Sequence, residues 1–350
     1  MTLEAFAANE RSRAALERTR SELAGARSYI KELEGALERT RAVAEVRAAD
    51  TGTEPAWLTV APVGEKRATL CTVLSDLHLD EVVRPSEVGN INAYDRKIAE
   101  ARLERYFDHV IMLSRSYLAG VEYDGVVLML GGDLVSGSIH EELAETNEAP
   151  LPATIKHWVP LLAAGIRLLA EEFGKVHVAS VVGNHGRLTK KSRAKLRAFD
   201  NADWLIAQLL AERFADDPRV TFDVPDGTDA LVHVYRTTFL LTHGDQATGG
   251  GGIGGIWPPL MRLKARKQQR YLAQGQGFDW MVMGHWHQYV HGQGLIVNGS
   301  LKGYDEYAAV NNFPPERAQQ ALWVVTPEHG VTWAAPVFCD NPRAERRRRK

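Results

Sequence analysis

Apolar and polar positions divide most of the chain into short apolar runs and longer segments with helical spacing. The runs ATLCTVL, VVLML and VHVASVV are apolar on both faces, which is typical of buried strands. Segments near 94–118, 153–173 and 200–214 repeat apolar residues every three or four positions, which predicts helices. A series of short alternating strands follows, from RVTFDV to GVTWAAPV. Strands that alternate with helices and then follow one another predict an α/β sandwich.

Residues 1–48 carry a different pattern, with no proline and only two glycines. Apolar side chains recur there every seven residues, which is the spacing of a coiled-coil seam. The series is Leu16, Leu23, Ile30, Leu37 and Ala44. We expect a coiled-coil helix that pairs copies of the chain into a homo-oligomer. The alternative is a single helix that packs on its own domain.

Composition sets the remaining boundaries. Residues 49–66 are punctuated by glycine, proline and threonine and predict a linker. Residues 67–337 contain the predicted strands and helices of the globular domain. Residues 338–350 end in NPRAERRRRK, which predicts a disordered basic tail.

The overall composition is that of an ordinary globular protein. Of 350 residues, 45% are hydrophobic and 25% are charged, which excludes fibrous and wholly disordered chains. Two cysteines, Cys71 and Cys339, exclude a disulfide framework and favour a reducing compartment. The chain lacks a secretory apolar segment near its start and any apolar run of about 18 residues. We therefore expect a cytoplasmic protein that does not enter a membrane.

Five predicted strands each end in a polar cluster: SDLH, GGD, GNH, THG and GHWH. In α/β sheets the carboxyl ends of strands are where ligands bind. Together the clusters supply two aspartates, one asparagine and five histidines. These residues are Asp76, His78, Asp133, Asn184, His185, His243, His285 and His287.

This set of side chains predicts a site for two metal ions. Imidazole and carboxylate together suit divalent ions such as Mn²⁺, Fe²⁺ and Zn²⁺. One ion takes about three or four protein ligands, so eight groups exceed a single site. Two ions that share one carboxylate account for the number. Such a pair, about 3.5–4 Å apart, clamps a phosphoryl group and makes hydroxide available near neutral pH. A lone histidine motif is weak, since most such residues are core residues, but five clusters in order are specific.

The ordered set SDLH, GGD, GNH, THG and GHWH resembles that of the calcineurin-like metallophosphoesterase superfamily, over about residues 68–335. The longer strings GGDLVSG, GNHGR, LTHGDQ and NGSLKGYDEYA are similar to those of phage and prophage members described as repair-exonuclease-like. The resemblance implies a four-layer αββα sandwich with a dinuclear site at one end, preceded here by the predicted coiled-coil helix. For a phage-encoded chain, the compartment would be the host cytoplasm.

Carried over position by position, the resemblance implies two divalent ions, with Mn²⁺ expected and Fe, Zn or Mg as alternatives. The ligands of the first ion would be Asp76, His78 and His287. Those of the second would be Asn184, His243 and His285, and Asp133 would bridge the two. His185 would contact the scissile phosphate and protonate the leaving group.

The chain departs from the resemblance after GNH, where members usually carry Glu or Asp and this chain has Gly186. That acid commonly orients the catalytic histidine. An acid often found a few positions after GD is also missing after Asp133. Asp80 and Asp245 are the candidates for replacing the orienting acid.

The formal net charge of −2 conceals local basic segments. Residues 187–197 hold six basic side chains and no acidic one, directly after the GNH motif, and residues 262–270 hold five more. We expect Arg187, Lys190 and Lys191 to bind phosphates beside the scissile one, in a nucleic acid substrate. The alternative is a solvated basic helix face.

The string NGSLKGYDEY is unusually polar for a connection between strands. Two interpretations of it stay open, the rim of the site and a surface loop. Its polar residues are Lys302, Tyr304, Asp305 and Tyr307.

These observations predict an enzyme, a two-metal phosphodiesterase that hydrolyses nucleic acid by means of a metal-bridging hydroxide. One alternative is a phosphatase or cyclic-nucleotide phosphodiesterase that acts on small molecules, which the basic segments disfavour. A second alternative is a non-catalytic scaffold on the same fold, which the complete ligand set disfavours. Fold alone does not decide between these functions.

Overall fold

The computed structural model describes residues 54–59, 66–249 and 255–341, and four single helical positions, Arg20, Ala24, Arg27 and Lys31. Within the described residues, one compact unit spans 54–264 and 278–341, and residues 265–277 belong to a second unit. The seam residues of the predicted coiled coil lie outside the described residues, so the coiled coil stays a prediction. Residues 342–350 of the predicted tail also lie outside them.

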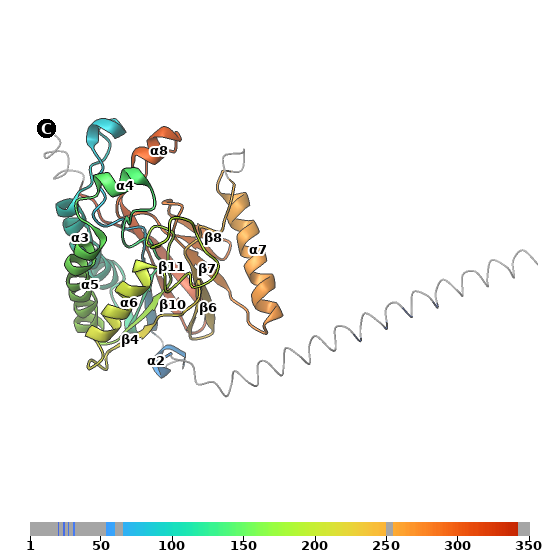
Figure 1. The fold of residues 1–350 in the computed structure, drawn as a ribbon. Coiled ribbons are helices and arrows are strands. Elements are labelled where there is room, and N and C mark those ends of the chain that lie inside the picture. The colour runs from blue at the N-terminus through green and yellow to red at the C-terminus, as the bar shows by residue number, and fades with distance from the viewer. Residues whose placement is uncertain are drawn as a thin grey trace, which may run out of the picture. The chain divides into compact units, whose positions relative to one another are not determined.

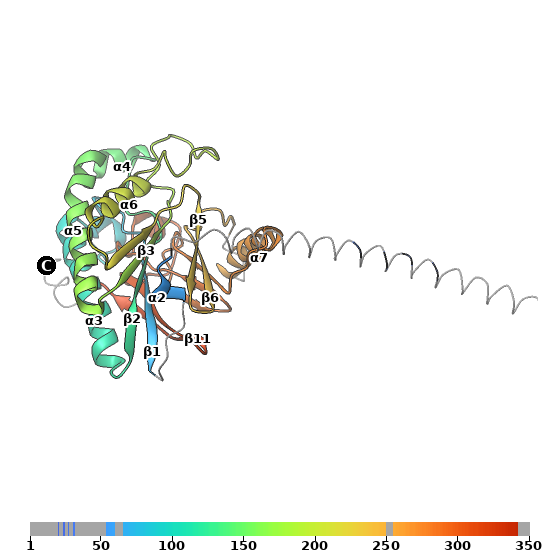
Figure 2. The same cartoon turned by 90° about the horizontal axis from the view of Figure 1, so that it is seen from below.

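The larger sheet of the main unit has six strands in the order β11-β10-β1-β2-β3-β4 (Figures 1 and 2). Strands β1 to β4 are mutually parallel, β10 lies antiparallel beside β1, and β11 lies antiparallel beside β10. The six strands are β1 (Arg67–Leu74), β2 (Glu122–Leu130), β3 (Val176–Ser180), β4 (Val220–Asp223), β10 (Gln319–Thr326) and β11 (Gly330–Phe338).

The smaller sheet has five strands in the order β5-β6-β7-β9-β8. Strands β6, β7 and β9 are parallel, while β5 and β8 are antiparallel strands at the two edges. The five strands are β5 (Asp229–Val234), β6 (Thr237–Thr242), β7 (Trp280–Met283), β8 (Val290–Gly292) and β9 (Leu295–Val297). Two mixed sheets with helices confirm the predicted α/β class.

The two sheets pack face to face, and this packing explains the continuous apolar runs in the sequence. Successive residues of β1 face different cores: Leu70 and Leu74 lie in the core beneath the helices, and Val73 in the core between the sheets. In the inter-sheet core, the rings of Trp323 and Phe239 approach with centroids 5.6 Å apart. A strand buried on both faces has no polar alternation to show in its sequence.

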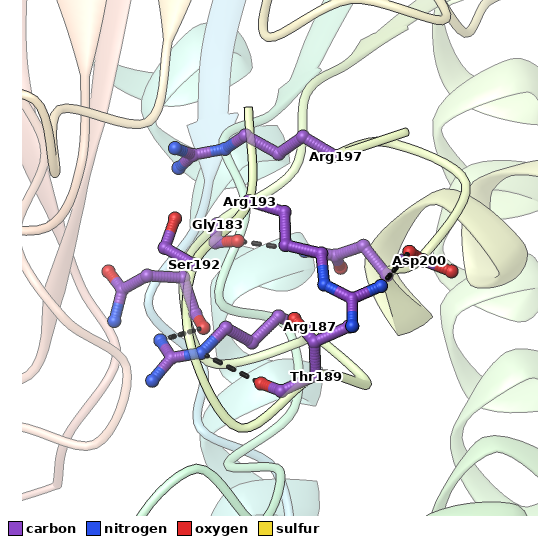
Figure 3. Close-up of a pocket in the computed structure, with 9 residues that line it drawn as sticks. Gly183, Arg187, Thr189, Ser192, Arg193, Arg197 and Asp200 are labelled. Atoms are coloured by element: carbon purple, nitrogen blue, oxygen red, sulfur yellow. Dashed lines mark hydrogen bonds and ion pairs between the residues drawn. The ribbon is translucent and has the colours of Figure 1, made fainter. Parts of the chain in front are cut away.

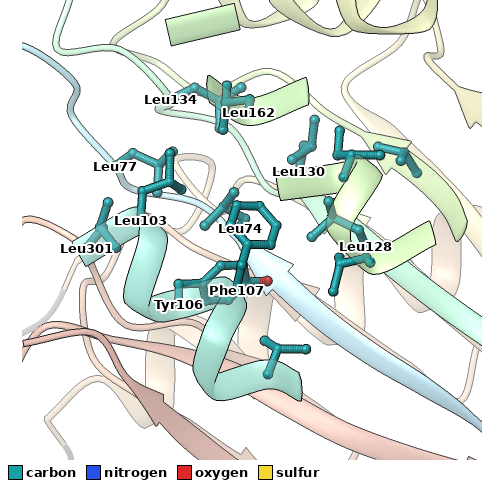
Figure 4. Close-up of a cluster of buried hydrophobic side chains, with 14 of the residues drawn as sticks. Leu74, Leu77, Leu103, Tyr106, Phe107, Leu128, Leu130, Leu134, Leu162 and Leu301 are labelled. Atoms are coloured by element: carbon teal, nitrogen blue, oxygen red, sulfur yellow. The ribbon is translucent and has the colours of Figure 1, made fainter. Parts of the chain in front are cut away.

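Three long helices cover the outer face of the larger sheet, where they enclose the main apolar cluster (Figure 4). They are α3 (Arg96–Met112), α5 (Leu151–Phe173) and α6 (Ala202–Arg213). These bounds confirm the three predicted helices to within a few residues. Helices α3 and α5 pack closely, since a Cβ at Gly165 would lie 2.0 Å from the Phe107 ring.

Six further helical elements complete the described part of the chain, one of 17 residues and five of four to six residues. They are α2 (Ala56–Thr59), η1 (Pro85–Val88), η2 (Leu113–Tyr117), α4 (Glu141–Thr146), α7 (Trp257–Ala273) and α8 (Glu306–Val310). Helix, sheet and sheet thus form three layers of the main unit. The fourth layer of the expected sandwich stays a prediction, because α7 is divided between the two units. No helix among the described residues has the length and apolar character needed to cross a bilayer.

Part of the predicted linker 49–66 belongs to the folded unit. Leu58 of α2 is completely buried in the inter-sheet core, and its carbonyl accepts a hydrogen bond of 2.8 Å from the Tyr235 amide. The neighbouring Trp57 packs against the same core. The linker assignment is therefore wrong for residues 54–59, because two large apolar side chains anchor this segment.

The predicted boundary at residue 338 is also too early. Strand β11 continues through Phe338, and the side chain of Cys339 is buried in the core beneath the helices. Asp340 forms an ion pair of 2.6 Å with Arg317. The folded unit therefore extends to at least residue 340.

Candidate metal centre

The five polar clusters of the sequence meet at one edge of the two sheets. Three follow β1, β2 and β3 of the larger sheet, and two follow β6 and β7 of the smaller one. Hydrogen bonds join the clusters: the Asp76 amide donates to the Gly132 carbonyl, and the His285 amide to Asp76 Oδ1 at 2.8 Å. The second bond links the two sheets directly. We call the eight clustered residues the candidate metal centre.

The first ligand group of the centre contains Asp76, His78 and His287, with one potential ligand atom from each within 4.8 Å of the others. His287 Nε2 lies 3.4 Å from Asp76 Oδ1 and 3.1 Å from His78 Nε2. Asp76 is completely buried. The structure thus brings together the three residues expected at the first ion.

The second ligand group contains Asp133, His243 and His285 within the same limit. His243 Nε2 lies 3.0 Å from Asp133 Oδ2 and 3.2 Å from Asn184 Oδ1, so Asn184 joins this group. A third group, His78, Asp133 and His185, connects the other two. Asp133 therefore lies between the groups, where a bridging carboxylate is expected.

The hydrogen bonding of His243 tests whether these residues fit a metal ion. Its Nδ1 lies 2.8 Å from the Gly131 carbonyl, which can only accept, so Nδ1 carries the proton. The neutral ring then directs the Nε2 lone pair at the Asp133 carboxylate. Two acceptors at 3.0 Å repel unless a cation lies between them or the ring takes up a second proton. The donor set therefore fits a divalent cation at this position.

Charge within the centre follows the same logic. Burial alone lowers the pKa of His243, but the carboxylates of Asp133 and Asp76 raise it to about 10. Burial and the nearby Lys302 charge lower the pKa of His78 to about 4, and burial with the His243 charge does the same for His285. His78 and His285 are therefore neutral at pH 7, which is the form that binds metals.

His185 lies in the connecting group and is held by two contacts. Its amide donates to Asp133 Oδ1 at 2.7 Å, and its Nδ1 lies 3.0 Å from the Ser136 carbonyl. Its ring centroid is 4.4 Å from that of His78. The ring is thus oriented by a backbone carbonyl, with Nε2 left for another partner.

Neither acid proposed to replace the orienting carboxylate does so. Asp80 accepts hydrogen bonds from Arg96, Thr154 and Trp158, which tie it to helices α3 and α5. Asp245 forms an ion pair with Arg197. Both carboxylates are engaged elsewhere, and the Ser136 carbonyl takes over the orienting role. Ser136 lies in the segment after Asp133 where the acid is missing.

The crowded surroundings of Gly186 explain why no acid follows GNH in this chain. A Cβ at this position would lie 2.3 Å from Asn201 Oδ1 and 3.0 Å from the Asp203 carboxyl carbon. Asp203 is completely buried and accepts from the amides of Asp133, Leu134 and Gly183 at 2.9–3.1 Å. It therefore ties the loop after β2 to the loop after β3. Any larger residue at 186 would displace this connection.

Asp203 supports the centre, although it was not predicted from the sequence. In the sequence it is an ordinary acid in the first turn of a helix, 17 positions beyond the Gly186 that it contacts. Burial and the Asp133 charge raise its pKa to about 6. The only local signal for its role is the glycine after GNH.

A buried chain of charges supports His78 from behind. His78 Nδ1 lies 3.2 Å from Glu81 Oε2, and Lys302 Nζ lies 2.7 Å from Glu81 Oε1 and 2.6 Å from Asp305 Oδ2. All four residues are buried. A carboxylate on Nδ1 fixes the tautomer and aims Nε2 at a metal. Lys302 and Asp305 are thus part of the site, whereas Tyr307 is 70% exposed on α8.

The backbone of the centre is strained. Five of its non-glycine residues have φ between 47° and 67°, in the left-handed region that side chains disfavour. They are Asp76, His78, Asp133, His285 and His287. Such residues persist only where the surrounding structure forces them, and they gather at functional sites.

The basic segment after GNH divides into two parts. Arg187 donates to the carbonyls of Asn184 and Thr189 at 2.9 and 3.2 Å, which brings it beside the centre. Lys190 and Lys191 are exposed and do not line the pocket there. Their role in binding substrate stays a prediction.

No protein-family model and no curated protein matches the chain. Solved structures do match. A dimetal phosphatase from Danio rerio is 10% identical, with 78% of this chain and 99% of that chain covered and a TM-score of 0.36. Vps29 from Cryptosporidium parvum is 15% identical, with 77% and 96% covered and a TM-score of 0.31. A predicted phosphoesterase from Streptococcus pneumoniae is 11% identical, with 77% and 97% covered and a TM-score of 0.27. Likenesses this weak assign no function, which has to follow from the chain's own residues.

Proposed function

We propose that the chain is a two-metal phosphoesterase with the four-layer calcineurin-like fold, and that it hydrolyses phosphodiester bonds of nucleic acid. The observation that carries the proposal is the meeting of two Asp-His-His groups at one sheet edge, joined through the group of His78, Asp133 and His185. Three connected ligand groups exceed the needs of one ion and match those of two.

Each residue of the centre has a definite part in this proposal. Asp76, His78 and His287 hold one ion, Asn184, His243 and His285 hold the other, and Asp133 contributes to both. The mixed nitrogen and oxygen donors suit Mn²⁺, Fe²⁺ or Zn²⁺, and Mn²⁺ is the ion we expect. The chemistry that two such ions supply when bound is a lower pKa for water and neutralised charge on a phosphoryl group.

His185 provides the proton for the leaving oxygen. Its Nδ1 donates to the Ser136 carbonyl, which fixes the ring with Nε2 directed at the connecting group. When both nitrogens are protonated, the Ser136 carbonyl stabilises the positive charge of the ring. Nε2 then donates its proton to the oxygen that departs from phosphorus and leaves the ring neutral. His185 thereby acts on the substrate and leaves metal binding to its neighbours.

The basic segment 187–197 supports a polynucleotide substrate, since its six positive charges begin beside the centre. A small-molecule phosphatase or cyclic-nucleotide phosphodiesterase needs the same metals without these charges. A non-catalytic scaffold needs neither. The strained backbone at five centre residues favours an active site over a scaffold, because strain of this kind is retained where it serves a function.

Hydrolysis by the purified protein tests the proposal. With Mn²⁺ added, we expect two ions per chain by elemental analysis and turnover of bis-p-nitrophenyl phosphate and of single-stranded DNA, duplex DNA or RNA. Asp133→Ala should abolish turnover and lower the metal content, while the exposed Asp226→Ala should change neither. If none of these esters and no cyclic nucleotide is hydrolysed, the proposal that the protein is an enzyme is wrong. Turnover of small esters without salt-sensitive polynucleotide binding would favour the phosphatase.

A further inference from the structure

A pocket lined by three arginines lies beside the candidate metal centre (Figure 3). It is formed by the loop that follows β3 and by the start of α6, and Arg187, Arg193 and Arg197 line it. Asn184 belongs to both sites: its Oδ1 lies 3.2 Å from His243 Nε2, and its carbonyl accepts from Arg187. The pocket therefore starts where the second ligand group ends.

The arginines of the pocket are only partly neutralised. Arg187 is bonded to backbone carbonyls, which carry no net charge. Arg193 lies 3.8 Å from Asp200, a loose ion pair, and its side chain is 67% exposed. Arg197 pairs with Asp245, which does not line the pocket. Three guanidinium groups against the two carboxylates that pair with them leave one net positive charge at the pocket.

The side chains have the geometry to receive an oxyanion. The guanidinium groups of Arg187 and Arg197 extend to the same side of the loop, and Ser192 lies between them (Figure 3). Guanidinium offers paired donors that match two oxygens of a phosphate, and a hydroxyl supplies one more. Asn184 faces the second ligand group with its side chain and Arg187 with its carbonyl, so the pocket adjoins the centre.

We propose that this pocket binds a second phosphate group of the substrate, next to the scissile one. The inference rests on the proposed function and makes it narrower. The substrate would then be a nucleic acid strand, or the phosphorylated end of one, in which a second phosphate group neighbours the scissile one. A compound with a single phosphate group would not be the preferred substrate. Arg193 and Arg197, which the sequence analysis did not select, are then specificity-determining residues.

Dinucleotides that differ by one phosphate test the proposal. The substrates are TpT, which has only the scissile phosphate, pTpT with an added 5′ phosphate and TpTp with an added 3′ phosphate. We expect kcat/KM for pTpT or TpTp to exceed that for TpT about tenfold or more, because charge-assisted hydrogen bonds of this kind are strong. A preference for pTpT would place the 5′ side of the scissile phosphate at the pocket, and a preference for TpTp would place the 3′ side there.

Variants of the pocket should reduce this preference. Arg193→Gln and Arg197→Gln should each lower, severalfold, the ratio of kcat/KM for the preferred phosphorylated dinucleotide to kcat/KM for TpT. The main change should be a higher KM for the phosphorylated dinucleotide. Lys195→Gln is the matched control, since Lys195 is an exposed cation of the same loop that does not line the pocket. A ratio that neither arginine variant changes, or that Lys195→Gln lowers equally, overturns the proposal. Thermal unfolding of each variant shows whether the loop remains folded.

Failure of the pocket and failure of the metal centre give different results. If bis-p-nitrophenyl phosphate is hydrolysed and no dinucleotide is preferred, the phosphoesterase stands and the second phosphate site is wrong. If nothing is hydrolysed, calorimetric titration of pTpT into metal-free protein still tests the pocket. Tighter binding of pTpT or TpTp than of TpT, lost in Arg193→Gln, supports the site, and equal binding of all three overturns it.

Discussion

Three histidines of the candidate metal centre have a protein acceptor 2.8–3.2 Å from Nδ1. The partners are the Gly131 carbonyl for His243, the Ser136 carbonyl for His185 and the Glu81 carboxylate for His78. Each partner fixes the ring tautomer, so Nε2 carries the lone pair or the mobile proton. Residues that never touch a metal or a substrate therefore set what the histidines can do.

Replacing His185 separates proton transfer from metal binding. Because no proposed ligand role depends on it, His185→Ala should keep two metal ions per chain and lower kcat about 10²- to 10⁴-fold. Metal analysis and steady-state kinetics measure the two effects. His329→Ala, an exposed histidine on the β10–β11 turn, serves as the control. Loss of an ion from His185→Ala would instead make His185 a ligand.

Replacing Lys302 tests the charges behind His78. Lys302→Met leaves the buried carboxylates of Glu81 and Asp305 without their cation, so Glu81 no longer holds His78 in place. We expect the affinity for Mn²⁺ to fall about 10- to 100-fold, with partial recovery in Lys302→Arg. Titration with Mn²⁺ measures this, and the exposed Lys66→Met should retain the wild-type affinity. If Lys302→Met lowers the melting temperature but leaves the affinity for Mn²⁺ unchanged, Lys302 stabilises the fold and does not support metal binding.

At the scale of elements, the parallel strands hold the centre in position, and β3 carries a buried histidine away from it. His177 is completely buried, and its Nδ1 lies 2.9 Å from the Thr221 hydroxyl of β4. Burial lowers the pKa of His177 to about 4, although Glu54 opposes the shift. The folded state therefore prefers neutral His177, whereas the unfolded chain protonates it near pH 6.5.

This preference gives the strand a pH-dependent stability. Between about pH 6.5 and 4 the unfolded state binds more protons, so the contribution of neutral His177 decreases as the pH falls through this window. When the pH is lowered from 7 to 4, the free energy of unfolding of the wild type should fall by up to about 3 kcal/mol more than that of His177→Gln. Urea unfolding of the metal-free wild type and of the metal-free variant measures this difference. The contributions of the other titrating groups are the same in both proteins and cancel. Parallel pH profiles would contradict the shift.

Elements and strand-end motifs were predictable from the sequence because their signals are local. A strand such as β1 is buried on both faces, so its sequence is one apolar run. The polar residues that follow this run indicate where the strand ends. Lys302 and Glu81 are different, because 221 positions separate them and nothing in the string NGSLKGYDEY indicates that Lys302 pairs with Glu81. Helix α2 escaped detection since four residues with two apolar side chains resemble a connection. Contacts between distant segments require the fold to be known.

At the scale of the whole molecule, the near-zero net charge results from opposite local charges. The basic segment 187–197 begins beside the centre, where Arg187 donates to the Asn184 carbonyl, and residues 343–350 are also rich in basic side chains. On the proposed function, a polynucleotide would be attracted to this segment. This arrangement favours binding that depends on salt and is directed to the centre.

Residues 1–48 determine the assembly of the molecule if the heptads pair chains. Deleting residues 1–48 should lower the particle mass in solution and leave kcat/KM for bis-p-nitrophenyl phosphate unchanged, since the centre is built from later residues. Light scattering after gel filtration measures the mass. Leu23→Asp with Ile30→Asp should act like the deletion, while Arg20→Ala with Arg27→Ala, at exposed helical positions outside the seam, should not. A monomeric full-length protein would contradict the pairing.

The left-handed backbone at Asp76, His78, Asp133, His285 and His287 has an evolutionary consequence. Each such residue costs the fold about 1–3 kcal/mol, which the rest of the molecule has to offset. A descendant released from catalysis would gain stability from glycine or asparagine at any of these positions. On the proposed function, loss of activity by such substitutions would therefore be accompanied by a gain in stability.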